Sequence, residues 1–205
     1  WRWATSPPMS AGISSMASPG AWCSEDSMSE MIWTIANRCD PIAASLADRH
    51  YSRQTVGSKH FVPPGRCLVL VSKCQRAVWV TSWPFAEYVR HEWAGAWVCS
   101  IFRNEGAGLS STLIRQAVAA TRWYHKHGPT SWTTHKEPDL GMITFVWPDK
   151  VASSNPGYCY QRAGWKKVGH SKEKRLPCFQ LLPHEMSANE QPIGTTGALF
   201  GGLDE

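Results

Sequence analysis

The chain has 205 residues, of which 42% are hydrophobic and twelve are tryptophan. This is enough apolar surface for one domain with a substantial core, which excludes a wholly disordered chain. The net charge of +5 is uneven, because residues 31–183 hold 20 Lys/Arg against 9 Asp/Glu while both ends are acidic. A domain this basic favours a polyanionic partner such as nucleic acid, or a phosphate-rich cofactor. The alternative is a basic surface that only keeps the protein in solution.

The cellular setting is predicted from cysteines and hydropathy. Seven scattered cysteines without a CxxC pair are typical of a reducing interior, so we expect a cytoplasmic protein. No apolar run approaches the roughly 18 residues of a membrane-spanning helix, so no membrane partner is expected. His125 and His127, with His135, are interpreted as solvated side chains at a helix end, and no metal is expected.

The first half of the chain predicts one helix and three strands. Asp40 and Pro41 open the helix as N-cap and first-turn proline, and its apolar face runs to about His50. After a loop at 58–65, three apolar runs predict strands, the first two joined by a hairpin turn at residues 73–76. These strands are expected at 67–71, 77–83 and 96–102.

The second half opens with a long amphipathic helix, expected at 109–127 and stopped by Gly128-Pro129. Further elements are expected as strands at 130–134, 142–147, 166–169 and 178–182 and a short helix at 158–163. This order predicts an α/β (α+β) domain over residues 31–183, with a mixed sheet covered by helices on both faces. Residues 1–30 are expected to form a flexible arm and residues 184–205 a flexible tail.

The segment Arg103-Asn104-Glu105-Gly106-Ala107-Gly108 joins the third strand to the long helix. Backbone N–H groups at a helix N-terminus lack partners within the helix, and the helix dipole adds positive charge, so such a turn can hold a phosphate. Glycines allow the backbone to approach the phosphate closely. An ordinary strand-to-helix turn is the alternative. The residues expected to contact a phosphate-bearing ligand are Ile101, Arg103, Asn104, Glu105, Gly106, Ala107, Gly108, Leu109 and Ser110.

The spacing Arg-x-x-Gly-x-Gly resembles the acyl-CoA pyrophosphate loop of the GNAT (Gcn5-related N-acetyltransferase) superfamily. A second segment, Tyr160-Gln161-Arg162-Ala163-Gly164-Trp165, is similar to that family's late Tyr-x-x-x-Gly-Phe segment. Over residues 38–183 the resemblance implies a GNAT-like fold and acetyl-CoA, or another acyl-CoA, as cofactor. It also implies that Tyr160 protonates the departing thiolate and that a strand N–H near Cys99 to Ile101 holds the thioester carbonyl. Asn155 stands closer to Tyr160 than the family's asparagine does, so that contact is not carried over.

The end of the first helix, Asp48-Arg49-His50-Tyr51-Ser52-Arg53, is expected to border the acceptor site. The His-Tyr-Ser triplet resembles one in phage Mom-like proteins, GNAT relatives that modify adenine in DNA. That resemblance implies that Arg49, Ser52 and Arg53 bind the substrate. His50 and Tyr51 would then stack on or hydrogen-bond a base, which must be flipped out of the duplex. The alternative is a helix C-terminus with a favourable cation and a packed tyrosine.

Three functions remain open from the sequence. The first is an acyl-CoA-dependent N-acyltransferase that acts on a base in DNA, bound through a basic face. The second keeps the fold and acylates a small amine or a protein amino group. The third is a non-catalytic nucleic-acid-binding protein. For the two enzymes, the candidate general bases are Glu137, Asp139, His135 and His50.

Overall fold

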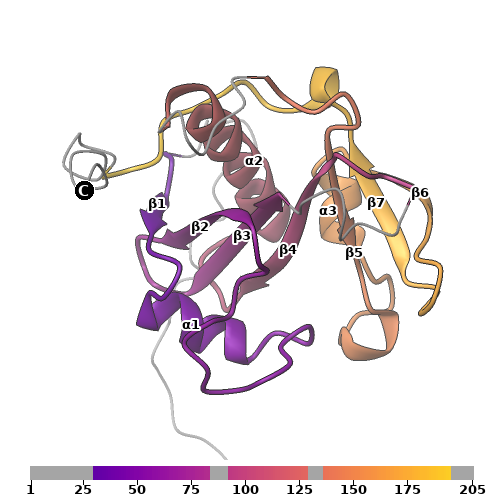
Figure 1. Cartoon of the computed structure of the whole chain (residues 1–205), viewed down its shortest axis with the longest axis horizontal. Helices are drawn as coiled ribbons and strands as arrows, with labels where there is room; N and C mark the ends of the chain where they lie inside the picture. Colours follow the sequence, from indigo (N-terminus) through magenta and orange to yellow (C-terminus); the bar gives the residue numbers. More distant parts are fainter. Residues whose placement is uncertain (1–29, 84–91, 129–135, 195–205) are drawn as a thin grey trace, which may run out of the picture. The chain divides into compact units, whose positions relative to one another are not determined.

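In a computed structural model of the chain, the described residues are 30–83, 92–128 and 136–194. Their helices and strands alternate along the sequence and form a mixed α/β domain around one sheet (Figure 1). In chain order the elements are β1 (Trp33–Ala36), α1 (Pro41–Asp48), β2 (Arg66–Ser72), β3 (Ala77–Trp83), β4 (Trp97–Asn104), α2 (Ser110–His127), β5 (Met142–Phe145), η2 (Pro148–Lys150), α3 (Tyr158–Arg162), β6 (Lys166–His170), β7 (Pro177–Leu181) and η3 (Pro183–Glu185).

The sheet has seven strands in the order β1-β2-β3-β4-β5-β7-β6. Every neighbouring pair is antiparallel except β4 and β5, which run parallel. A parallel pair needs a long crossover connection, and α2 lies in the connection between these two strands. Both strands of a parallel pair end at the same edge of the sheet. The loop after β4 and the end of β5 therefore lie at this one edge.

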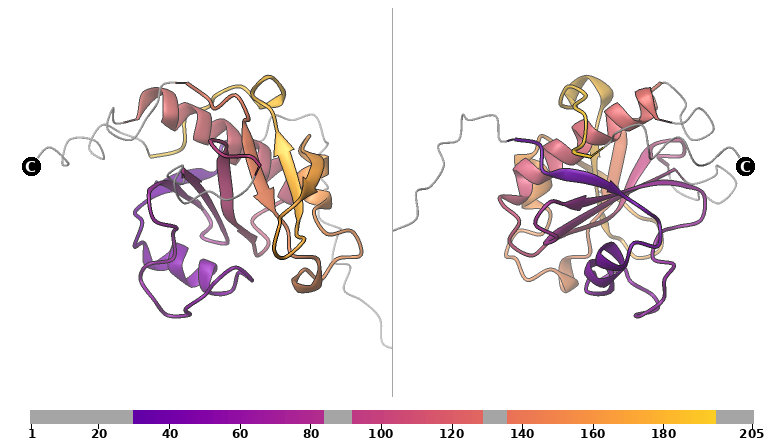
Figure 2. Two further views of the ribbon diagram at one scale, coloured as in Figure 1. Left: turned by 45° about the vertical axis from the view of Figure 1, so that its right-hand side comes forward. Right: turned by 90° about the vertical axis from the view of Figure 1, so that its left-hand side faces the viewer.

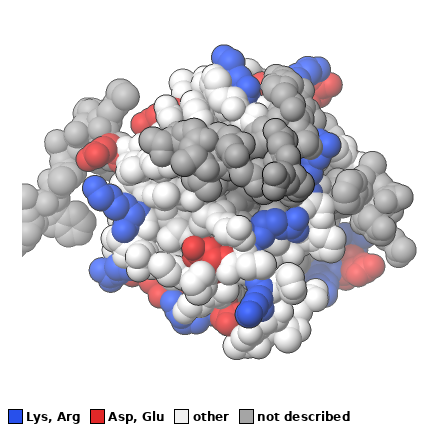
Figure 3. Space-filling view, turned by 60° about the vertical axis from the view of Figure 1, so that its left-hand side comes forward, with Lys and Arg blue, Asp and Glu red and all other residues white. Residues whose placement is uncertain are grey.

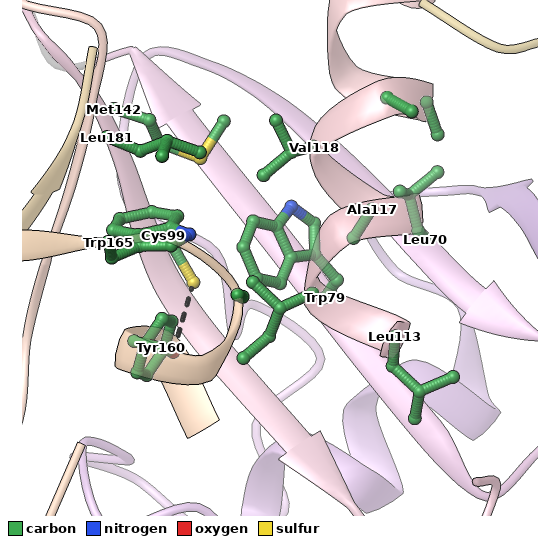
Figure 4. Close-up of a cluster of buried hydrophobic side chains, with 14 of the residues drawn as sticks. Leu70, Trp79, Cys99, Leu113, Ala117, Val118, Met142, Tyr160, Trp165 and Leu181 are labelled. Carbon is green, nitrogen blue, oxygen red and sulfur yellow. Dashed lines mark hydrogen bonds between the residues drawn. The ribbon is translucent and has the colours of Figure 1, made fainter. Parts of the chain in front are cut away.

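Helices cover both faces of the sheet, with α1 on one side and α2 on the other (Figure 2). Alternate residues of β2 separate into two cores, since successive strand side chains point to opposite faces. Leu68 and Leu70 belong to the large core under α2 and α3, whereas Val69 and Val71 pack against α1. Figure 4 shows the larger core, which surrounds the fully buried Trp79.

The expected mixed α/β class is confirmed, and the predicted start of the first helix at Asp40 and Pro41 also holds. Asp40 caps α1 by accepting a hydrogen bond from the Ala43 N–H at 2.8 Å, and Pro41 occupies the first turn. The strand β1 was not expected. The expected strand at 130–134 and the expected arm at 1–29 lie outside the described residues.

The predicted flexible tail differs from the structure in its first part. Residues 183–193 pack on the domain: Met186 is buried in the large core, and the Ile193 N–H donates to the Trp33 carbonyl at 2.8 Å. Arg122 of α2 donates to the carbonyl oxygens of Met186 and Ser187. The segment has few apolar residues, so its sequence does not indicate the main-chain hydrogen bonds that hold it on the domain.

Candidate functional site

The parallel strands β4 and β5 separate soon after they meet. They pair at Trp97–Met142 and Val98–Ile143 and no further, although β4 continues to Asn104 (Figure 1). Beyond the pairs, the Thr144 hydroxyl donates to the Cys99 carbonyl at 3.0 Å. A side chain thus replaces the next backbone bond, and a gap opens between the C-terminal ends of the two strands.

A β-bulge at Ser100 changes the direction of the side chains of β4 beside this gap. Val80 pairs with Ile101 and Thr81 with Cys99, so the strand register skips Ser100, whose Oγ donates to the Val80 carbonyl at 3.3 Å. Cys99 faces the large core, Ile101 packs on the α1 side, and Phe102 returns to the large core. Bulges re-aim side chains and leave backbone unpaired. Ile101, a predicted ligand contact, can therefore offer its backbone but not its buried side chain.

Tyr160 lies on the α2 and α3 side of the gap. Its ring packs among Phe102, Trp165 and Phe179, and its hydroxyl lies 3.6 Å from the Cys99 Sγ (Figure 4). Burial raises the pKa of the Tyr160 phenol well above its ordinary value, and burial raises the pKa of the Cys99 thiol to about 12. Both groups therefore keep their protons at neutral pH, and the Tyr160 hydroxyl is available as a donor.

The loop after β4 differs from the expected phosphate cradle. The Asn104 Oδ1 accepts from the amides of Gly106 and Ala107 at 3.1 and 2.9 Å, and the Glu105 amide donates to the Arg76 carbonyl. These three amides are therefore already used. The Asn104 Nδ2 also donates to the Gly108 carbonyl and the Ser110 Oγ. Asn104 thus braces the loop, and its side chain is not free to contact a ligand.

Unpaired amides lie slightly further along the chain. The first bond of α2 runs from the Leu113 N–H to the Leu109 carbonyl, and the N-cap residue Leu109 makes no side-chain cap. In the part of the chain that the structure describes, the amides of residues 108–112 have no hydrogen-bond acceptor. Gly108, at φ +147°, turns the chain into this helix start. The free amides therefore lie in the first turn of α2, with Ser110 inside it and Leu109 exposed beside it.

Arginines surround the start of this loop. The Glu105 carboxylate accepts from the Arg49 Nε and Nη2 at 2.7 and 2.9 Å and from the Arg103 Nε at 2.6 Å. These bonds lower the pKa of Glu105 to about 2. Arg76 was not predicted from the sequence. It comes from the β2–β3 hairpin, donates to the Glu105 carbonyl, and lies 2.8 Å from where a side-chain carbon on Gly106 would be.

Residues 49–51 span the ends of the separated strands on the α1 side. Arg103 of β4 donates from Nη1 to the Arg49 carbonyl, and the Tyr51 hydroxyl donates to the Phe145 carbonyl of β5 at 3.2 Å. His50 therefore lies between the two anchored positions. Its ring stands 4.1 Å from that of Tyr51, and their role toward a base stays a prediction.

The hydrogen bonds at Nδ1 of His50 indicate that its Nε2 carries the ring proton and can donate. Its Nδ1 accepts from the Ser52 N–H at 3.2 Å and lies 2.7 Å from the Ser52 Oγ. This network assigns the ring proton to Nε2. Burial, and then the nearby Arg103, lower the pKa of His50 to about 4, so the ring is neutral at pH 7. With Nδ1 occupied and Nε2 protonated, His50 is not placed as the general base that the sequence suggested.

Arg53 is also not free for a substrate phosphate. Its Nε donates to Asp48 at 2.6 Å and its Nη1 to the His60 carbonyl, and its side chain is only 6% exposed. Ser52 is committed to His50. Both residues fix the turn after α1, and Arg49 and Ser52 are the exposed members of the predicted substrate-binding set.

Glu137 and Asp139 lie apart from the gap. They precede Gly141, whose carbonyl accepts from the Trp97 N–H where β4 begins, so they lie at the opposite end of the parallel pair. Glu137 pairs with Arg122 of α2 and lines a polar cavity of about 190 Å³ there. Asp139 pairs with Lys136 on the surface. Neither carboxylate is therefore positioned as a general base for a reaction at the gap. His135 lies outside the described residues.

The expectation for His125 is wrong, because it is not solvated. It is 6% exposed, stacks on Trp97 at 4.5 Å, and meets the edge of Trp83. Burial lowers its pKa to about 3. Within the described residues, no group of three or more His, Cys, Asp or Glu side chains is arranged to hold a metal. Likewise, no described helix is both long and apolar enough to cross a membrane.

Charge on one face of the molecule is mixed. In Figure 3, Lys and Arg side chains are separated by uncharged atoms and by Asp and Glu, and they do not merge into one basic patch on that face. Comparison of the chain with protein-family models, with curated proteins and with solved structures found no match. Function is therefore inferred from the geometry of the separated strands.

Proposed function

We propose that this chain is an acyl-CoA-dependent N-acyltransferase of GNAT type, with the corresponding fold. The observation that carries the proposal is the gap between β4 and β5, which has Tyr160 on one side and the uncapped start of α2 at its end. The two strands pair at only two positions before they separate, and unpaired amides at residues 108–112 suit a diphosphate. The Arg-x-x-Gly-x-Gly spacing and the Tyr-x-x-x-Gly-Trp segment support the same assignment.

The proposed reaction is direct transfer. An amine nitrogen forms a bond to the thioester carbon, the carbon–sulfur bond breaks, and the Tyr160 O–H gives its proton to the departing sulfur. A backbone N–H at the Ser100 bulge would stabilise the carbonyl oxygen as it gains charge. The amine's proton passes to water at the open end of the gap, since Glu137 and Asp139 lie elsewhere. Water also returns a proton to Tyr160.

We further propose a base in DNA as the acceptor. Supporting this, the His50 and Tyr51 rings lie side by side next to the separated strands; His50 is buried, and the partly exposed Tyr51 ring could stack on a planar base. The basic balance of residues 31–183 agrees with a polyanionic partner. A small amine or a protein amino group remains the alternative acceptor. To separate them, acetyl-CoA is incubated with DNA, the DNA is digested, and nucleosides are examined for an added acyl mass. Acylation of a polyamine or peptide, with unchanged nucleosides, would exclude DNA.

Calorimetry with acetyl-CoA tests the cofactor without requiring the acceptor. Gly108→Asp places a carboxylate beside the open amides of α2 and should abolish binding. Gly95→Asp is a matched control, because Gly95 also has a positive φ and open space around it but precedes the start of β4. Wild-type protein and Gly95→Asp should bind saturably. Absence of binding by wild-type protein, or equal binding by both variants, would refute the proposed cofactor site.

A further inference from the structure

Glu105 places a negative charge beside the proposed anion site. Its carboxylate lies in the loop that leads to the unpaired amides of α2, where a negative charge opposes a phosphate. Its hydrogen bonds give it another role, since it accepts three N–H groups from Arg49 and Arg103. It is 29% exposed, so these ion pairs are screened and add little to the stability of the fold.

The bonds around Glu105 form a closed ring. Arg103 donates to Glu105 through Nε and to the Arg49 carbonyl through Nη1, while the Arg49 side chain returns to Glu105. The Arg49 Nη1 also donates to Ser45 of α1 at 3.0 Å. The backbone at residue 49 is thereby fixed to the end of β4 by both its carbonyl and its side chain.

This ring determines where the next two side chains lie. Tyr51 fixes the other end of the short segment to β5, and His50 lies between these anchors. The remaining bonds of the turn, from Arg53 to Asp48 and His60, connect it only to its own loop. Within the described residues, the bonds through Glu105 and Arg103 relate the segment to the anion-binding loop.

We propose that Glu105 is a positioning residue that holds residues 49–51 across the gap and couples them to ligand binding at the start of α2. This inference rests on the proposed function, since the ligand is an acyl-CoA and His50 and Tyr51 face the acceptor. Binding of acyl-CoA beside the loop stabilises the ring, and the ring keeps His50 and Tyr51 in place. Glu105 itself touches neither substrate.

Glu105→Gln tests the proposal, because it keeps the side-chain shape and removes the charge. Amide hydrogen exchange at residues 50–52 of the free protein should become about 3- to 10-fold faster. Arg49→Gln breaks the same ring from α1 and should give the same result. Glu185→Gln is the matched control, since its carboxylate pairs with Lys166 far along the chain; exchange at residues 50–52 should not change.

Acetyl-CoA separates positioning from cofactor binding. Calorimetry should find that the acetyl-CoA affinities of Glu105→Gln and wild-type protein differ less than about 3-fold, because removal of a like charge offsets the lost coupling to the ring. Acetyl-CoA should slow exchange at residues 50–52 in wild-type protein and not in Glu105→Gln. Unchanged exchange in the free variant, or equal slowing by acetyl-CoA in both proteins, would overturn the inference. Failure of wild-type protein to bind acetyl-CoA would instead refute the proposed function, and the exchange rates of the free proteins would still decide whether the ring exists.

Discussion

The Tyr160 hydroxyl lies 3.6 Å from the Cys99 Sγ, at the point where β4 leaves β5. The two groups come from elements 61 positions apart in the chain. In the proposed reaction, this places the Tyr160 proton where the sulfur atom of a bound thioester would leave.

Replacing Tyr160 by phenylalanine should slow turnover about ten-fold or more while acetyl-CoA affinity changes less than about three-fold. The lost hydroxyl acts after binding, so kcat falls and ground-state binding is kept. Steady-state kinetics and calorimetry measure the two effects. Tyr158→Phe is the control, because Tyr158 lies on the same helix but is 53% exposed. Equal kcat for wild-type protein and Tyr160→Phe would remove this residue from the reaction.

Asn104→Ala should weaken acetyl-CoA binding about ten-fold although the side chain contacts no ligand. Without its four hydrogen bonds, the loop no longer presents the start of α2 in one conformation, and binding must pay the cost of ordering it. Calorimetry gives the affinity, and amide exchange at residues 105–110 should become faster. Asn104→Asp, which keeps the acceptor for Gly106 and Ala107, should retain more of the loop's protection. Unchanged exchange in Asn104→Ala would show that the brace is unnecessary.

Stability should fall as the pH falls from 7 to 5, because His50 and His125 have pKa values of about 4 and 3 in the folded protein. In the unfolded chain both take up protons near pH 6.5. The unfolded state therefore binds more protons in this window, and folding stability is present above pH 6.5 and lost below it. Together they should lower the free energy of unfolding by on the order of 2–4 kcal/mol between pH 7 and pH 5.

Urea unfolding at several pH values checks this dependence. His125→Phe keeps an aromatic ring between Trp83 and Trp97 and should remove about half of the slope. His170→Gln, at an exposed position of β6, should leave the slope unchanged. Stability that is level from pH 7 to pH 5 would mean that both rings can charge without leaving their sites.

Gly157→Ala should destabilise the domain by at least about 2 kcal/mol more than Gly95→Ala. Both glycines have a positive φ near +90°, so the backbone strain is shared. At Gly157 an added carbon would stand 2.3 Å from the Phe179 ring, whereas at Gly95 nothing lies within 4 Å. Denaturant unfolding measures the difference. Equal losses would show that Phe179 can move aside without disturbing α3.

Local patterns predicted much of the fold. The capped helix α1 and the long α2 are specified by their own residues, as are the strands from β2 to β4. The strand β1 was missed because Trp33 to Ala36 has no clear alternation and gains its structure by pairing with β2. The burial of His125 was missed for a similar reason, since Trp83 and Trp97 come from distant strands.

The candidate site was predicted less completely. Tyr160, His50 and Tyr51 lie beside the separated ends of β4 and β5, and the roles that short motifs gave them stay predictions. The amides of Gly106 and Ala107 are hydrogen-bonded because the Asn104 side chain folds back onto them. Residue spacing alone does not specify this conformation. Arg76 reaches the loop from a separate hairpin. Glu137 was chosen as an acid of suitable type, but only three-dimensional pairing places it beside Arg122.

Because just two residue pairs join β4 to β5 in the described sheet, this seam is the weakest line of main-chain connection in the domain. Strands β1 to β4 and strands β5 to β7 should therefore behave as two cooperative units, which open separately before global unfolding. Native-state exchange would resolve them as two classes of protection. A molecule bound along this seam would hold the two units together, so the two classes of exchange protection would merge into one.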